Sequence, residues 1–164
     1  MAGETNRFVL DMPALPENVG LARLVVAGLA AQLPFTVSDV EELKVAVSEA
    51  VTNVVLHAYA GTDVAPEERL LQVRGLLFPD RIEVEVADWG RGIEDLDRAR
   101  EPAFTTAPER MGLGFAFMES FADGVEVESR PGEGTRVRLV KRLQAEGAGA
   151  AGVAGSGTGS AGAG

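Results

Sequence analysis

Three polar side chains recur at intervals of four residues in the segment "SEAVTNVVLHAY", residues 48–59. They are Glu49, Asn53 and His57. On an α-helix they lie at about 0°, 40° and 80°, beside an apolar face at about 100° to 200°. A carboxylate in such a stripe can accept a proton, and an amide oxygen one turn away can ligate a hard cation such as Mg²⁺. The spacing favours proton transfer beside a cation site, with a solvated boundary stripe as the alternative.

The segment "DWGRGI", residues 88–93, directly follows a predicted strand. It places Asp88 at the end of the strand, and Gly90 and Gly92 where the backbone can turn sharply and approach a ligand. An aspartate in this position can accept a hydrogen bond from an amino group such as that of adenine. The pattern indicates a binding loop, and a plain Asp-Gly turn is the alternative.

A third group of candidates lies in "GLGFAF", residues 112–117, where Gly112 and Gly114 open a predicted helix. Free N–H groups and the helix dipole make such a position suitable for an anion, although glycine-rich helix starts without a ligand are common. Two familiar nucleotide motifs are absent from the sequence. No Gly-Lys pair forms a P-loop, and Phe117 stands where a dinucleotide fingerprint requires glycine or alanine.

The elements that must position these residues follow from the hydrophobic periodicity. Alternation of apolar and polar residues predicts strands at residues 7–12, 70–78, 81–88, 125–129 and 135–143. The helical period predicts helices at residues 17–33, 38–58 and 114–121, and Ser38 and Glu41 have the spacing of a capping box for the second. These elements predict an α+β fold, a two-layer sandwich with helices on one face of a mixed, mostly antiparallel sheet.

The segment between the second glycine motif and the third helix has no sustained periodicity. Residues 90–111 contain Pro102 and Pro108, and a long irregular stretch inside a compact domain is usually functional. We therefore expect this segment to be a lid beside the candidate site.

Composition limits the organisation and the partners of the chain. With 164 residues and 46% hydrophobic residues, we expect one domain at residues 1–144 and a flexible Gly/Ala-rich tail at residues 145–164. The absence of cysteine excludes disulfides and thiolate sites, and the single histidine excludes a multi-histidine zinc site. A formal charge of −10 argues against nucleic acid as a partner. No segment is long and apolar enough for a membrane span and no basic signal segment opens the chain, so we expect a cytoplasmic protein without a membrane partner.

The motifs occur in a specific order: an E-x-x-x-N helix, a strand ending in D-x-G-x-G, a lid, a G-x-G helix, and "GEGT" before the last strand. This order resembles the ATP-binding fold shared by histidine kinases, gyrase, Hsp90 and MutL. Within that superfamily, "VSEAVTNVVLHAY", "REPAFTTAPERMGLGFAFMESFAD" and "GTRVRL" resemble the anti-sigma factor serine kinases of the SpoIIAB/RsbW type. The likeness covers about residues 5–143.

The resemblance implies a role for each candidate residue. It implies that Glu49 is the general base for the attacking serine hydroxyl, and that Asn53 holds the Mg²⁺ that bridges the ATP phosphates. Asp88 would bind the adenine amino group with support from Thr135. The cofactor-binding set implied by the family also contains the glycines and lid residues Gly90, Gly92, Thr105, Thr106, Arg110, Gly112 and Gly114.

The resemblance leaves the roles of three residues to be considered separately. The lid is a residue or two shorter than the family usually shows, so Arg110 is either a phosphate contact or a solvated surface charge. His57 lies on the helix of the base and is assigned a structural or substrate-orienting role, rather than that of a phosphate acceptor. Arg23 matches a partner-facing arginine of the family, with an ordinary surface arginine as the alternative.

The family also implies how the protein acts. We expect a dimer, with Leu21, Leu24, Val25 and Leu29 contributing an apolar contact. It would bind and inhibit a sporulation-type sigma factor, bind ATP or ADP, and phosphorylate an anti-anti-sigma protein on serine with Mg-ATP. The alternatives are a non-catalytic ATP-dependent sigma-binding module, a regulator of stress rather than sporulation, and a free-standing ATPase. A histidine-kinase catalytic domain is disfavoured, because the sequence contains no histidine-bearing helical hairpin.

Overall fold

A computed structural model describes residues 3–101 and 110–145 of the chain. Its sheet has the strand order β1-β2-β3-β5-β4, and each pair of neighbours is antiparallel. The strands are β1 (Asn6–Pro13), β2 (Leu70–Phe78), β3 (Arg81–Asp88), β4 (Gly124–Arg130) and β5 (Gly134–Arg142). The strands predicted from alternation are therefore all present.

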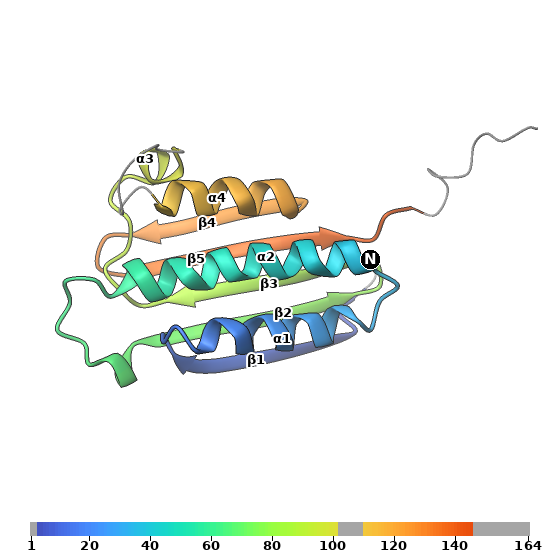
Figure 1. The fold of residues 1–164 in the computed structure, drawn as a ribbon, viewed down its shortest axis with the longest axis horizontal. Coiled ribbons are helices and arrows are strands. Elements are labelled where there is room, and N and C mark those ends of the chain that lie inside the picture. The colour runs from blue at the N-terminus through green and yellow to red at the C-terminus, as the bar shows by residue number, and fades with distance from the viewer. Residues whose placement is uncertain (1–2, 102–109, 146–164) are drawn as a thin grey trace, which may run out of the picture.

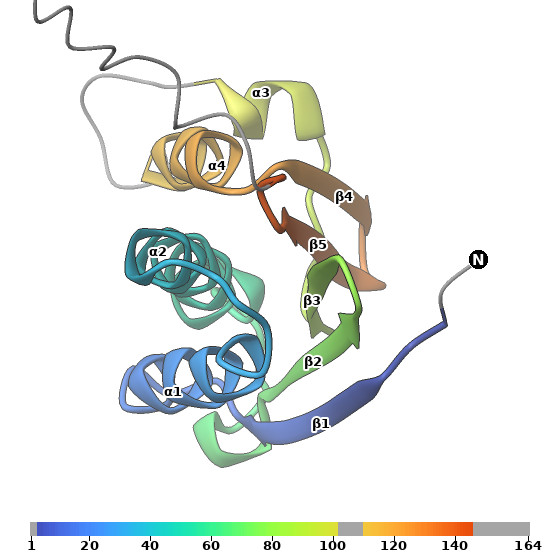
Figure 2. The ribbon, with the colours of Figure 1, turned by 90° about the vertical axis from the view of Figure 1, so that its right-hand side faces the viewer.

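The helices form a second layer on one face of this sheet (Figures 1 and 2). The long helices are α1 (Asn18–Ala30), α2 (Val37–Asn53) and α4 (Arg110–Phe121). The short ones are the π-helix η1 (Val54–Ala58), the 3₁₀ helix η2 (Pro66–Glu68) and α3 (Leu96–Arg100). The other face of the sheet is left uncovered by the described helices (Figure 2). This arrangement confirms the α+β sandwich.

The core lies between the two layers because the strands alternate as the sequence predicts. Ile82, Val84 and Val86 of β3 form the sheet side of this core. Phe115 and Met118 of α4 are buried on its helix side. The helix layer contributes the small residues Ala46, Val47, Ala50 and Val51 of α2, which allow that helix to approach the sheet closely. Burial of this apolar surface is the main term that stabilises the sandwich.

The opposite face of the sheet contains charged residues in cross-strand pairs. Glu83 is only 7% exposed, although it lies on the uncovered face. Burial by itself disfavours its charge, but hydrogen bonds and charge from Arg138 and Arg81 outweigh burial and lower the pKa of the carboxyl group. Arg138 Nη2 lies 2.8 Å from Glu83 Oε2, and Arg81 Nε lies 2.9 Å from Glu83 Oε1. The pairing explains why a carboxylate is tolerated there.

The N-cap of α2 lies two residues before the predicted one, at Thr36 instead of Ser38. Thr36 is the N-cap in an extended conformation, and its Oγ1 accepts from the Asp39 N–H at 3.1 Å. The Asp39 carboxylate accepts in turn from the Thr36 N–H at 3.0 Å, which completes a capping box. Ser38 and Glu41 have the same spacing but lie inside the helix, because Thr36 already occupies the extended position that a cap requires.

The segment predicted to be irregular contains two helical pieces. Asp95 caps α3 by accepting from the Arg98 N–H at 3.0 Å, and α4 begins at Arg110 rather than at Gly114. The rest of the predicted lid, residues 102–109, lies outside the described residues, and so does the predicted tail from residue 146 onward. No helix in the described part of the chain is long and apolar enough to span a membrane.

Candidate functional site

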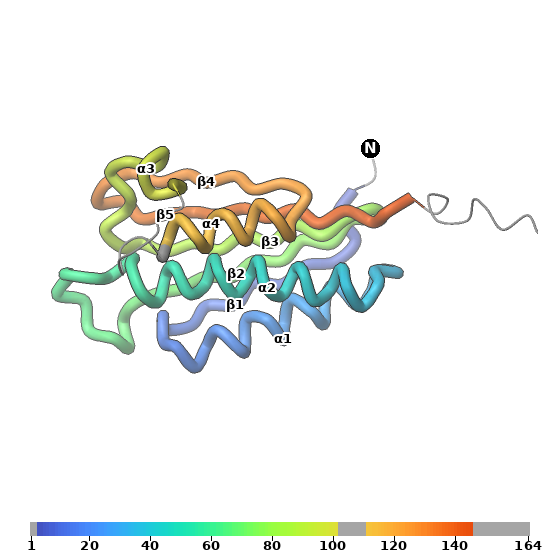
Figure 3. Tube along the Cα trace, turned by 45° about the horizontal axis from the view of Figure 1, so that its top comes forward, coloured from blue at the N-terminus to red at the C-terminus, as the bar shows by residue number. Residues whose placement is uncertain are grey.

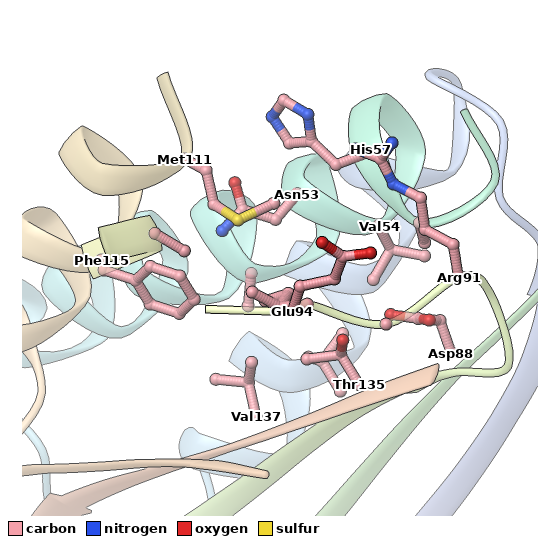
Figure 4. Close-up of a pocket in the computed structure, with 16 residues that line it drawn as sticks. Asn53, Val54, His57, Asp88, Arg91, Glu94, Met111, Phe115, Thr135 and Val137 are labelled. Carbon is pink, nitrogen blue, oxygen red and sulfur yellow. The ribbon is translucent and has the colours of Figure 1, made fainter. Parts of the chain in front are cut away.

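A cavity of about 400 Å³ lies where the C-terminal end of α2, the loop after β3 and the start of α4 meet. Its apolar walls include Val86 and Val137 from the sheet and Phe115 from α4. Figure 4 shows polar side chains from three separate segments around it: Asn53 and His57, then Asp88 and Arg91, then Thr135. An apolar cavity with a few convergent polar groups is the usual form of a small-molecule site.

Asp88 lies at the end of β3, where the strand reaches the cavity, and is only 6% exposed. Its Oδ1 accepts from the Gly90 N–H at 2.9 Å, and its strand partner in β5 is Thr135. Burial raises the pKa of the Asp88 carboxyl, and the backbone N–H groups of Gly90 and Thr135 partly offset the rise. The result is a fixed hydrogen-bond acceptor in a cavity lined by both polar and apolar side chains.

The two glycines after Asp88 allow the loop to pack against neighbouring backbone. A Cβ atom at Gly90 would lie 1.9 Å from the Ala58 carbonyl oxygen. Gly92 has φ of +70°, and a Cβ there would lie 2.1 Å from the Arg130 carbonyl oxygen. The close approach predicted for these glycines is therefore made, in the described structure, to the chain's own backbone. It holds the loop between η1 and the turn that joins β4 to β5.

Glu49 and Asn53 converge beside Gly114 of α4. A Cβ atom built at Gly114 would lie 3.1 Å from Glu49 Oε2 and 3.3 Å from Asn53 Oδ1. Both distances are tighter than ordinary contacts, so the glycine allows α4 to approach the two polar side chains. Asn53 also lines the cavity, whereas Glu49 lies next to it outside the lining. The predicted i and i+4 pair therefore faces a single point at the edge of the cavity.

Two buried polar atoms at this edge have no hydrogen-bond partner among the residues that the structure describes. They are Asn53 Nδ2 and His57 Nε2, and both residues line the cavity. Burial lowers the pKa of His57, and the charge of Arg91 lowers it further, so the imidazole is neutral at neutral pH. Buried polar groups normally have a hydrogen-bond partner. A polar ligand in the cavity would supply partners for these two atoms.

The chain matches the family model described as the histidine kinase-like ATPase domain over residues 12–141. The chain belongs to that family. It is 43% identical over 140 residues to an anti-sigma F factor of Caldanaerobacter subterraneus, a match that covers 84% of this chain and 94% of the relative. It is 41% identical over 142 residues to an anti-sigma F factor of Pasteuria penetrans, covering 85% and 93%. These matches place the chain in the anti-sigma F factor group of the family.

Solved structures agree on the fold. The RsbU and RsbW domains of Rv1364c from Mycobacterium tuberculosis match with a TM-score of 0.59 and 21% identity, covering 85% of this chain and 32% of that one. A blue-light activated histidine kinase domain from Erythrobacter litoralis matches with a TM-score of 0.51 and 20% identity, covering 80% and 61%. The histidine-kinase-like sandwich predicted from the sequence is thereby confirmed.

In this histidine kinase-like ATPase domain the predicted site residues fall into three groups. Asn53, Asp88, Gly92 and Thr135 line the cavity together. Glu49, Gly90 and Gly114 lie next to the cavity but do not line it. Gly112, the third residue of α4, is also outside the lining. A Cβ at Gly112 would lie 1.9 Å from the Glu101 carbonyl oxygen, so this glycine allows α4 to pack on the end of α3.

The described structure does not bring the remaining predicted residues to the cavity lining. Arg23 is on α1, outside the lining of the cavity, and its buried Nε has no hydrogen-bond partner within residues 3–101 and 110–145. Thr105 and Thr106 lie outside the described residues. Arg110 is the first residue of α4, and its side chain is likewise outside the description. The phosphate roles expected of these lid residues remain predictions.

Sequence reasoning missed several residues that line the cavity of this domain. Arg91 and Glu94 belong to the predicted loop but were given no role, and Met111 and Phe115 come from α4. The strand alternation could have identified Val86 and Val137, because both lie on the same face as Asp88 and Thr135. Met111 would have required the true start of α4, whereas Phe115 already lies inside the predicted helix.

Proposed function

We propose that the protein is an anti-sigma factor with Mg-ATP-dependent protein serine kinase activity. It binds and inhibits a sigma factor, and it transfers the γ-phosphoryl group of ATP to a serine of an anti-anti-sigma protein. The observation that carries the proposal is the convergence of Glu49 and Asn53 beside Gly114, at the edge of the cavity that Asn53 shares with Asp88. Similarity to curated anti-sigma F factors supports the partner class.

The cavity suits the adenine end of ATP. Its volume of about 400 Å³ lies in the usual range for small-molecule sites. Val86, Val137 and Phe115 supply apolar surface for a planar base, and Asp88 supplies an acceptor for the exocyclic amino group. Because Asp88 is fixed by the Gly90 N–H, the acceptor is oriented before the base arrives.

The residues around Asn53 fit a magnesium ion that is carried by the nucleotide. The described residues contain no group of three or more His, Cys, Asp or Glu side chains able to hold a metal ion. Mg²⁺ in phosphoryl-transfer sites is commonly held by one or two protein oxygens together with phosphate oxygens and water. The unsatisfied Asn53 amide meets that requirement, since a half-turn of the amide exchanges its oxygen and nitrogen. The bound ion would neutralise charge on the phosphates during transfer.

Glu49 is the proposed general base. A serine hydroxyl brought beside Gly114 gives its proton to the Glu49 carboxylate while its oxygen forms a bond to the γ-phosphorus, and the bond to the β-phosphate oxygen breaks to release ADP. Asn53 and the N-terminal N–H groups of α4 hold the phosphates in position. The remaining chemistry is positioning and charge neutralisation.

The partner-binding roles are assigned to the helix layer. Arg23 on α1 is the proposed contact to a partner protein. Leu21 and Leu24 on the same helix are 42% and 71% exposed, which suits the proposed homodimer contact. Cytoplasmic localisation and a sporulation-type sigma factor remain part of the proposal, with a stress-response sigma factor as the alternative.

The test uses Glu49→Gln with radiolabelled ATP and a purified anti-anti-sigma protein. Loss of a positioned base is expected to lower the rate of partner phosphorylation about 10²- to 10⁴-fold, with ATP affinity largely retained. Glu41→Gln is the matched control, since Glu41 is an exposed glutamate on the same helix paired with Lys44. Wild-type rates in Glu49→Gln would reject the base assignment.

A non-catalytic binding module is the main alternative. It predicts that the wild type binds the anti-anti-sigma protein in the presence of ATP without transferring phosphate to it. A free-standing ATPase instead predicts appreciable phosphate release without any partner. Partner phosphorylation and partner-free phosphate release, measured in the same preparation, separate the three functions.

A further inference from the structure

Three neighbouring strands place Asp88, Thr135 and Ser129 in one row. Strands β3, β5 and β4 lie side by side in the sheet (Figure 3). Asp88 of β3 is the strand partner of Thr135 in β5, and Thr135 is in turn the strand partner of Ser129 in β4. Asp88 and Thr135 line the cavity (Figure 4), whereas Ser129 lies on the far side of Thr135, outside the lining. Ser129 is therefore one side chain removed from a ligand in the cavity.

The Ser129 hydroxyl makes three hydrogen bonds. It accepts from the Ile93 N–H at 2.8 Å, and it lies 2.8 Å from Thr135 Oγ1. It also donates to the Gly134 carbonyl oxygen at 3.1 Å. A hydroxyl has one hydrogen and two acceptor lone pairs, so these contacts use its whole capacity. The orientation of the Ser129 hydroxyl is thereby fixed.

Only one placement of the hydroxyl hydrogens satisfies all three contacts. The Gly134 carbonyl oxygen cannot donate, so the Ser129 hydrogen must lie between Ser129 and Gly134. The bond between the two hydroxyls must then be donated by Thr135. The Thr135 hydrogen is therefore directed at Ser129 in β4. Toward the cavity, the Thr135 hydroxyl can only accept.

We propose that Ser129 is a positioning residue that keeps the Thr135 hydroxyl an acceptor toward the cavity and so selects 6-amino over 6-oxo purines. This inference rests on the proposed nucleotide site. The amino group of adenine carries two hydrogens, and the Asp88 carboxylate and Thr135 Oγ1 are acceptors on neighbouring strands of the cavity wall. A 6-oxo purine has a carbonyl oxygen at the same ring position. Neither side chain offers that oxygen a hydrogen, which leaves it unpaired.

A merely structural role for Ser129 has a different consequence. Because its hydroxyl accepts from the Ile93 N–H, it also holds the loop after β3 against β4. Loss of that bond would loosen the cavity wall and weaken the binding of every nucleotide by a similar factor. The preference between two bases would stay the same. The ratio of two affinities therefore separates positioning of Thr135 from support of the loop.

The experiment compares ATP with ITP, whose base has an oxygen where adenine has its amino group. ATP with Mg²⁺ is titrated calorimetrically into wild type, Ser129→Ala and Ser129→Thr, and the Kd of ITP is measured by displacement of ATP. In Ser129→Ala the Thr135 hydroxyl loses its acceptor and can turn to donate into the cavity. The ratio of the ITP Kd to the ATP Kd should then fall about two- to tenfold, the effect of one neutral hydrogen bond.

Two variants control for the loss of a hydroxyl. Ser129→Thr keeps the hydroxyl and should keep the wild-type ratio. Ser120→Ala removes a hydroxyl that donates to the Ala116 carbonyl oxygen within α4, outside the cavity lining, and should change neither Kd. Thermal melting shows whether each variant keeps its fold. If Ser129→Ala does not fold, Ser129→Cys replaces it, because a thiol fills similar space but accepts only weakly, and its ratio should also fall.

A double-mutant cycle tests the route through Thr135. Thr135→Val removes the hydroxyl that Ser129 orients. In that background Ser129→Ala should leave the ratio of the two Kd values unchanged, because no hydroxyl remains to turn. A further fall of the ratio in the double variant would contradict the assignment.

The outcomes separate the role of Ser129 from the proposed function. An unchanged ratio in Ser129→Ala, including an equal loss of ATP and ITP affinity, overturns the role of Ser129 and leaves the nucleotide site standing. A fall of the same size in Ser129→Thr also overturns it, since the hydroxyl would not be the cause. If wild type binds neither nucleotide, the proposed site fails and the role of Ser129 fails with it. If ATP binds but no phosphate is transferred, the kinase function alone fails.

Discussion

At the scale of single residues, Asp88 combines two opposing requirements. The proposed function requires a carboxylate at the end of β3 to accept from an amino group, yet burial disfavours the charged form of Asp88 and raises its pKa. The Gly90 and Thr135 N–H groups offset only part of this effect. The residue is thus expected to lower the stability of the free protein at neutral pH in return for an oriented acceptor.

Asp88→Asn tests both consequences. The amide presents a donor toward the adenine amino group, so ATP affinity should fall about tenfold to hundredfold, as expected for one unpaired polar group of ~1–3 kcal/mol. A raised folded pKa stabilises the protein below the unfolded pKa, and this contribution is lost as pH rises through the folded pKa. The wild type should therefore gain stability relative to Asp88→Asn as pH falls from neutral into the acidic range.

The measurement is the difference in urea midpoint between the two proteins across that pH range. An increase in the relative stability of the wild type toward neutral pH would contradict the raised pKa. Unchanged ATP affinity in Asp88→Asn would remove Asp88 from the adenine contact. The two readouts are independent, so each part of the assignment can fail separately.

Residue types and spacing identified part of the site directly. The polar stripe of Glu49, Asn53 and His57 could be found because helix geometry alone places the three on one side. Asp88 and Gly92 could be found because they follow a clear strand. Arg91 could not, since its place depends on a tertiary contact: its N–H donates to the Ala58 carbonyl oxygen at 2.7 Å.

At the scale of elements, the same contact accompanies a change of helix type that the sequence does not indicate. The predicted helix ran to Ala58, but the α-helix ends at Asn53 and continues as the π-helix η1. π-helical turns are rare and frequently occur at functional sites. Here the turn carries His57 at the cavity and presents the Ala58 carbonyl to the loop after β3. Periodicity cannot reveal it, because one turn is too short to shift the pattern.

The contact between α2, α4 and β5 depends on a buried cation. The Lys141 side chain is 6% exposed, whereas its partner Glu42 is 36% exposed. Removing Glu42 leaves a buried ammonium with the Phe121 carbonyl and with Asp39 at 3.9 Å. Removing Lys141 leaves a carboxylate that water can reach.

Glu42→Ala is therefore expected to destabilise the protein more than Lys141→Met. A loss of about 2 kcal/mol in the free energy of unfolding is expected for Glu42→Ala, below the range for a fully buried pair because the carboxylate is partly hydrated. Lys141→Met should cost less, since methionine fills the same space without a charge. Urea unfolding of both variants provides the comparison, and a larger loss in Lys141→Met would contradict the burial argument.

At the scale of the whole molecule, the order of motifs along the chain was more informative than any single motif. Each glycine pair or acidic residue alone had an ordinary structural explanation, but their succession across strands and helices predicted one fold and one cavity. The sheet brings Asp88 and Thr135 together as partners in β3 and β5, although they are far apart in sequence. What the sequence could not supply was the packing of α4, whose start at Arg110 decides how Gly114 meets Glu49.

The central claim is that one cavity binds an adenine nucleotide together with magnesium between Asp88 and Asn53. Calorimetric titration of ATP into the protein, with Mg²⁺ and then with a chelator, tests it most directly. The account predicts binding of one ATP per chain, weakened by the chelator and by Asn53→Ala. No detectable binding of ATP in the presence of Mg²⁺ would contradict it.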